Sequence, residues 1–189
     1  MRVIGINGSA REDGNTALII GIIFKELQKQ GIQTELIQLA SKVIEPCRGC
    51  YKCKGNRQCA FLEDDFKEIF NKMIQSDGII LGSPVYSADV SSRMKAFLER
   101  SGVIISTNRG LLKHKIGVSV VAVRRGGALN AVDTMNHFLL NKEVYLVGSI
   151  YWNMVFGNEI GEVLTDNEGI ENMKNIGQNM AWLLKQINK

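Results

Sequence analysis

Residues 2–16 read RVIGINGSAREDGNT, and this stretch decides the fold. Its first five residues form a short, largely apolar run of strand length, and the next ten form a loop rich in Gly, Ser and Asn. A helical apolar pattern follows over residues 16–30, with Asn15 or Thr16 able to cap its start. The stretch therefore predicts a strand, a polar loop and a helix in direct succession.

The same alternation continues along the 189 residues. Apolar runs predict further strands at residues 78–82, 116–123 and 143–150, and a more polar strand at 34–39 suits an edge. A short helix after the third strand is expected to lead into a long connection, 102–115, and the segment 151–168 is expected to be irregular. Strands this rich in Val, Ile and Leu are typical of a parallel sheet covered on both faces. We predict one α/β domain over residues 1–189, a doubly wound five-stranded parallel sheet of order 2-1-3-4-5.

Composition excludes several functional classes. The net charge is +4, but Lys and Arg form no run and no stripe along a helix, so no nucleic-acid partner is expected. No apolar stretch approaches the roughly 20 residues of a membrane span, and the N-terminus does not resemble a signal peptide. We therefore expect a cytoplasmic protein with no membrane partner.

Two loops are expected to meet where the strand order reverses, between strands one and three, which is where such sheets bind ligands. The first loop suits a single phosphate at a helix N-terminus, and an ordinary capped turn is its alternative. It has neither the lysine of a P-loop nor the GxGxxG spacing. The third-strand loop suits contact with a flat ring, and the glycines after strand four suit close backbone approach. The candidate residues are Ser9, Arg11, Asn15 and Thr16, then Pro84, Val85, Tyr86 and Ser87, and then Gly126 and Gly127.

All four cysteines lie in the loop 43–62, at Cys47, Cys50, Cys53 and Cys59, spaced C-x2-C-x2-C-x5-C. Thiols gathered in one loop of a reducing compartment indicate a metal or redox site. Four thiolates satisfy a [4Fe–4S] cluster, with one thiolate on each iron. A four-cysteine zinc site competes with this interpretation, although such a site usually has two separated C-x2-C pairs. Free thiols or a regulatory disulfide would also be compatible with the spacing.

Three motifs carry a resemblance to a known family. They are N-G-S-x-R-x-x-G-N-T at 7–16, G-S-P-V-Y at 82–86 and S-x-x-x-K-A-F-x-E-R at 91–100. Together they resemble the flavodoxin-like NAD(P)H-dependent FMN reductases, and the cysteine spacing resembles that of the iron–sulfur flavoproteins among them. The resemblance implies FMN on the candidate loop residues and a [4Fe–4S] cluster on the four cysteines.

The resemblance also implies an FMN-dependent oxidoreductase in which the flavin, and no side chain, carries the chemistry. Electrons are expected to pass from a ferredoxin-like donor through the cluster to FMN and on to a small-molecule acceptor. The resemblance implies a homodimer or homotetramer, in which the cysteine loop, which follows the outermost strand, could serve the FMN of a neighbouring subunit. The segments 102–115 and 151–168 are candidates for that interface. A cluster-free NAD(P)H-dependent FMN or quinone reductase and a redox-sensing flavoprotein are the competing functions.

Overall fold

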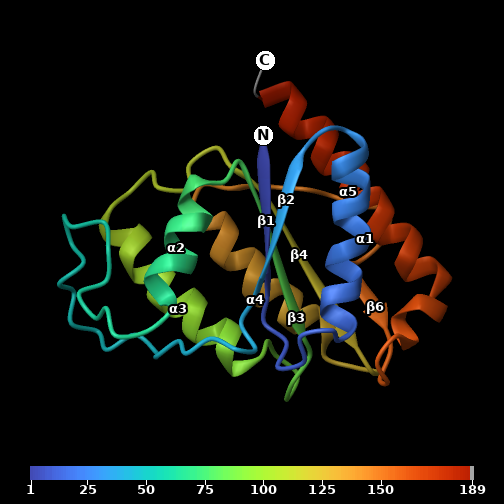
Figure 1. Ribbon diagram of the computed structural model, residues 1–189, viewed down its shortest axis with the longest axis horizontal. Coiled ribbons are helices and arrows are strands. Elements are labelled where there is room, and N and C mark those ends of the chain that lie inside the picture. Colours follow the sequence, from blue (N-terminus) through green and yellow to red (C-terminus); the bar gives the residue numbers. More distant parts are fainter. Residues whose placement is uncertain (188–189) are drawn as a thin grey trace.

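The computed structural model describes residues 1–187 and shows a central sheet between two layers of helices (Figure 1). Four strands form the long part of the sheet: β1 (Arg2–Asn7), β2 (Gln33–Gln38), β3 (Gly78–Pro84) and β4 (Ile116–Val123). Their order, completed by β5, is β2-β1-β3-β4-β5, and every pairing is parallel. This confirms the predicted fold class and strand order.

The fifth position of the sheet is filled by two short strands instead of one long one. β5 (Tyr145–Leu146) pairs with the start of β4, whereas β6 (Met154–Phe156) pairs with its end. The expected continuous strand at 143–150 and the irregular segment 151–168 are therefore both corrected. Gly148 and Ser149 interrupt the apolar run, and Val155 then returns to the core with no exposed surface.

Helices cover the sheet on both faces (Figure 1). One face carries α1 (Asn15–Lys29) and α5 (Asn167–Ile187), with the 3-10 turn η1 (Glu162–Thr165) leading into α5. The other face carries α2 (Phe66–Gln75), α3 (Ser92–Thr107) and α4 (Ala128–Leu140). Each layer encloses its own apolar core against the sheet, as a doubly wound fold requires.

Helix α3 is longer than its sequence indicates. The expected connection at 102–115 is wrong in its first part, because the helix continues through Gly102 to Thr107. Gly and the β-branched residues that follow it have low helix propensity. Burial of Ile104 and Ile105 in the core outweighs that preference, since packing of an apolar face supplies most of a helix's stability in a folded protein.

The cysteine loop lies outside these layers. Residues 39–65 connect β2 to α2 without a helix or strand, and the loop extends past the outer side of α2 and α3 (Figure 1). Among residues 1–187, no helix combines the length and the apolar character that crossing a membrane requires.

Candidate functional site

The carboxyl ends of β1, β3 and β4 enclose one pocket of about 140 Å³. Its walls combine predicted and unpredicted residues: Ser9, Arg11, Asn15, Thr16, Pro84, Val85, Tyr86, Ala122, Arg124, Gly157 and Asn158. The first seven are sequence candidates that the fold brings together. Ser87, Gly126 and Gly127 are candidates that do not line the pocket.

The N-terminus of α1 opens into this pocket without competition from the protein's own side chains. Its cap residue, Gly14, makes no side-chain hydrogen bond, and the first turn contains no acidic residue. Glu12 and Asp13 are exposed and do not line the pocket. The amides of the first helical turn have no partners within a helix, and the helix dipole favours an anion there. This end of α1 therefore suits a phosphate.

Two arginines add positive charge to the pocket. Neither Arg11 nor Arg124 forms a salt bridge among residues 1–187. The nearby Glu162 carboxylate accepts hydrogen bonds from the backbone amides of Glu159 and Asn158, at 2.9 and 2.6 Å. These bonds, together with the charge of Arg124, lower the pKa of Glu162. No acidic side chain is among the residues that line the pocket, so the lining itself is cationic.

Asn15 lines the pocket and also fixes one of its walls. Its side-chain amide donates to the Glu159 carbonyl at 2.9 Å, and its oxygen accepts from the Gly161 amide at 2.8 Å. Both polar ends of the side chain therefore hold the segment after β6 against α1. That segment contributes Gly157 and Asn158, which the sequence analysis missed. The sequence feature that could have indicated this segment is the glycine at 157. In the structure a Cβ at this position would lie 2.6 Å from the Val163 amide nitrogen, so only glycine fits there.

A serine network fixes the first and third loops to each other. The Ser91 hydroxyl donates to the Gly8 carbonyl at 2.6 Å and accepts from the Met94 amide at 3.2 Å, which caps α3. The Ser91 amide donates to the Ser83 hydroxyl oxygen at 3.0 Å. The pocket walls are therefore held in place by contacts within the protein.

A tight turn after Tyr86 forms the outer part of the pocket. Tyr86 and Asp89 exchange two backbone hydrogen bonds, at 2.9 and 3.0 Å. Between them, Ser87 and Ala88 adopt left-handed φ values of 49° and 61°, which strain residues other than glycine. Gly127 packs against this turn at φ +85°, and a Cβ there would lie 2.8 Å from the Ala88 Cα. Gly127 therefore supports the turn from behind.

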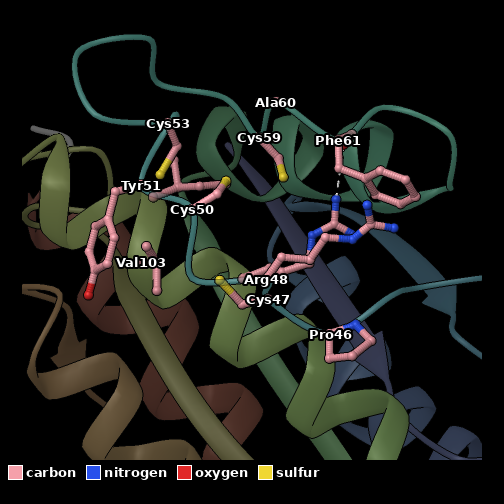
Figure 2. Close-up of a pocket in the computed structure, with 12 residues that line it drawn as sticks. Pro46, Cys47, Arg48, Cys50, Tyr51, Cys53, Cys59, Ala60, Phe61 and Val103 are labelled. Atoms are coloured by element: carbon pink, nitrogen blue, oxygen red, sulfur yellow. Dashed lines mark hydrogen bonds between the residues drawn. The ribbon is translucent and has the colours of Figure 1, made fainter.

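The four cysteines line a second pocket, on the outer face of α3 (Figure 2). Figure 2 shows their side chains directed into one small hollow, whose volume is about 40 Å³. The other lining residues include Phe61, Val103 and Ile104, so the walls are largely apolar. All four cysteines are free thiols. The predicted ligand set thus lies around one common space.

These thiols surround the hollow without gathering on a single point. In the described part of the chain, no three His, Cys, Asp or Glu side chains are close enough to share one metal ion. A zinc site needs four ligand atoms about 2.0–2.3 Å from one ion. The loop would therefore have to contract before the four sulfurs could hold a single zinc ion.

Helix α3 holds the cysteine loop at several points. Near its C-terminus, the Asn108 amide donates to the Cys53 carbonyl at 2.9 Å, and the Thr107 hydroxyl lies 3.6 Å from the Cys53 sulfur. Earlier along the helix, Arg100 pairs with Asp64, and both side chains are almost completely buried. The sequence analysis did not predict this pairing, although Arg100 ends the third motif. The sequence feature that could have indicated it is the position of Arg100, a charged residue that shares the apolar face of the helix with Phe97 and Ile104.

The sequence matches a known protein family over most of its length. Residues 1–159 match the family described as NADPH-dependent FMN reductase. The chain belongs to this family. It is accordingly an FMN-dependent oxidoreductase with a flavodoxin-like fold.

Individual relatives agree with the family. An iron–sulfur flavoprotein of Methanocaldococcus jannaschii is 37% identical over 196 residues, covering 100% of both chains. An iron–sulfur flavoprotein of Methanosarcina thermophila is 30% identical over 169 residues, covering 85% of this chain and 87% of that protein. A solved archaeal flavodoxin has a TM-score of 0.64 at 12% identity, covering 98% of this chain and 99% of the flavodoxin, and shows the fold alone.

The two glycines after β4 offer a matched test of the first pocket. We expect Gly127→Ala to destabilise the protein by about 1–3 kcal/mol and to weaken FMN binding, because its left-handed φ and the contact with Ala88 leave no room for a methyl group. Gly126→Ala has open space and should change neither property. Thermal unfolding and a fluorescence titration of the apoprotein with FMN measure both. Equal FMN affinities in the two variants would contradict this account.

Proposed function

We propose that this member of the family is an electron-transfer enzyme that holds FMN in the first pocket and a [4Fe–4S] cluster on Cys47, Cys50, Cys53 and Cys59. Electrons are taken from an acidic, ferredoxin-like donor and given to a small-molecule acceptor. The observation that carries the proposal is the placement of all four thiols around one largely apolar hollow. Thiolates of this number and grouping suit a cubane cluster.

The first pocket fits the parts of FMN. The amides of the first turn of α1, with Ser9, Arg11 and Thr16, bind the phosphate, and the side chain of Asn15 holds the wall. Pro84, Val85 and Tyr86 contact the ring, while Ser87, Gly126 and Gly127 shape the turn behind them. When bound, FMN supplies the exchange between one-electron and two-electron transfer.

The second pocket fits a cluster in charge as well as in ligands. Residues 46–62 contain no acidic side chain and four basic ones: Arg48, Lys52, Lys54 and Arg57. All four are exposed, and they offset the negative charge of four thiolates and their cluster. Phe61, Val103 and Ile104 give the hollow apolar walls. When bound, the cluster supplies transfer of single electrons.

The two pockets share no lining residue, and the cysteine loop lies outside α2 and α3 (Figure 1). We therefore propose that the cysteine site of one subunit serves the FMN of a neighbouring subunit in a homodimer or homotetramer. Exposed apolar side chains support the expected interface at 151–168. Tyr151, Trp152 and Ile160 are 50%, 55% and 62% exposed. Tyr151 and Trp152 lie against each other, with ring centroids 4.8 Å apart, and a contiguous exposed apolar patch favours an association surface.

Charge reversal in the cysteine loop tests where the donor binds. We expect Lys52→Glu to slow reduction by an acidic ferredoxin about tenfold at low salt, because like charges then meet at the encounter. The control is Lys25→Glu, which lowers the net charge from +4 to +2, as Lys52→Glu does. Lys25 is an exposed residue of α1, on the other face of the sheet. Stopped-flow rates at several salt concentrations provide the measurement. If the two variants are slowed to the same extent, the donor does not bind at this loop.

The family match favours one second candidate, a cluster-free reductase that takes electrons from NAD(P)H. This alternative predicts that NADPH bleaches the flavin rapidly in protein that contains no iron. The proposed function predicts slow bleaching by NADPH and rapid bleaching by a reduced ferredoxin. Both reactions are followed by flavin absorbance under anaerobic conditions.

A further inference from the structure

Arg100 joins the two ends of the cysteine loop. Its guanidinium donates to the carbonyl of Glu45, two residues before Cys47, at 3.2 Å. It also donates to the carbonyl of Phe61, two residues after Cys59, at 3.1 Å, a bond dashed in Figure 2. One side chain from α3 therefore closes the segment that carries all four thiols.

The position of this guanidinium is fixed on every side. It pairs with the Asp64 carboxylate, which also accepts from the amides of Glu45 and Phe66, at 2.9 and 3.3 Å. Its central carbon lies 4.1 Å from the centre of the Phe66 ring and 5.5 Å from that of Phe61. A planar fork that is stacked and hydrogen-bonded in this way cannot be reproduced by a lysine ammonium.

The buried pair is oriented with its positive end toward the cysteines. Arg100 lines the cysteine pocket, whereas Asp64 does not. Burial acts to lower the pKa of Arg100, but its hydrogen bond to the Asp64 carboxylate acts in the opposite direction, and the pKa lies above its ordinary value. Arg100 is therefore charged at every relevant pH. A permanent charge in such a site, with side-chain exposure of 2%, acts more strongly than a solvated one.

A purely structural ion pair would need no such orientation. We propose that Arg100 is the positioning residue of the cysteine site, which fixes the two ends of the loop around the hollow and raises the reduction potential of the cluster bound there. This inference rests on the proposed function. It assigns to Arg100 a role that none of the exposed basic residues of the loop can fill, because solvent and salt screen their charges.

The test compares the reduction potential of the full-length protein, reconstituted anaerobically, with the potentials of its variants. Arg100→Gln should shift the potential of the cluster to a more negative value, because a positive charge that favours the reduced state is lost. Asp64→Asn should shift it to a more positive value, because the opposing charge is lost. Potentials are measured by titration with dyes under electron paramagnetic resonance, and iron, sulfide and FMN are counted per chain.

Iron retention supplies the second readout. Partners that orient metal ligands typically contribute 10- to 100-fold to metal affinity, so the chelator concentration that removes half the iron should fall about tenfold in Arg100→Gln. Arg100→Lys keeps the positive charge but loses the planar guanidinium and its several hydrogen bonds. Its reduction potential should therefore stay close to that of the wild type, whereas its iron should be lost more readily. Arg93→Gln is the matched control, because Arg93 lies on the same helix but is exposed and lines neither pocket.

Shifts of opposite sign in Arg100→Gln and Asp64→Asn support the proposal, since a loosened loop alone would not reverse its effect between the two. Shifts of the same sign, or an Arg100→Gln variant indistinguishable from Arg93→Gln, overturn it. If Arg100→Gln fails to fold, as loss of FMN would show, the sign in Asp64→Asn decides. Absence of iron from the wild-type protein after reconstitution would instead contradict the proposed function.

Discussion

Replacement of Cys50 by Ser is expected to abolish cluster incorporation while FMN remains bound at one per chain. Serine does not replace a thiolate as an iron ligand in this set, so one iron loses its protein ligand. Cys50 is exposed, and the two pockets have no lining residue in common, so the FMN site should be undisturbed. Iron and sulfide analysis, with the flavin absorbance of the same sample, measures both cofactors.

The matched control is Gln58→Ser, which introduces the same residue at an exposed position of the same loop that carries no thiol. It should retain iron, sulfide and FMN at the wild-type level. Two results would contradict the two-site account: joint loss of iron and FMN from Cys50→Ser, and a full complement of iron in that variant.

Placing an acid in the first turn of α1 is expected to have opposite effects on stability and on FMN binding. Ala17→Asp should stabilise the apoprotein by about 0.3–1 kcal/mol, because a carboxylate at this end of the helix interacts favourably with its dipole. That turn now contains no acidic residue. The same charge should weaken FMN binding roughly 10- to 100-fold, or about 1.4–2.8 kcal/mol, by repelling the phosphate.

Ala17→Asn separates charge from size, because its side chain matches that of aspartate and is neutral. Thermal unfolding of the apoproteins and titration with FMN are compared among the three proteins. If the Asn and Asp variants bind FMN equally well, the phosphate does not lie at this end of α1.

The sequence predicts the sheet well because its signals are local. Runs of Val and Ile with polar ends define β4 at 116–123, as predicted. The strand order then brings the loops after β1 and β3 together without any knowledge of side-chain contacts. For this reason the candidates Ser9, Arg11, Thr16 and Tyr86 lie in one pocket.

The failures are contacts between distant parts of the chain. The division of the fifth position into β5 and β6 depends on pairing with opposite ends of β4, and the extension of α3 depends on burial of its second half. Asn15 is an example at a single residue. The motif places it at the start of α1, but it does not predict the hydrogen bonds to Glu159 and Gly161. The pairing of Arg100 with Asp64 joins a helix to a loop 36 residues away.

The central claim is that this chain carries both cofactors. Iron, acid-labile sulfide and extractable flavin should be determined per chain on protein purified without oxygen. The account predicts about four iron, four sulfide and one FMN per chain. One FMN with neither iron nor sulfide, even after anaerobic reconstitution, would contradict it and would leave the cysteines as thiols in an NAD(P)H-dependent reductase.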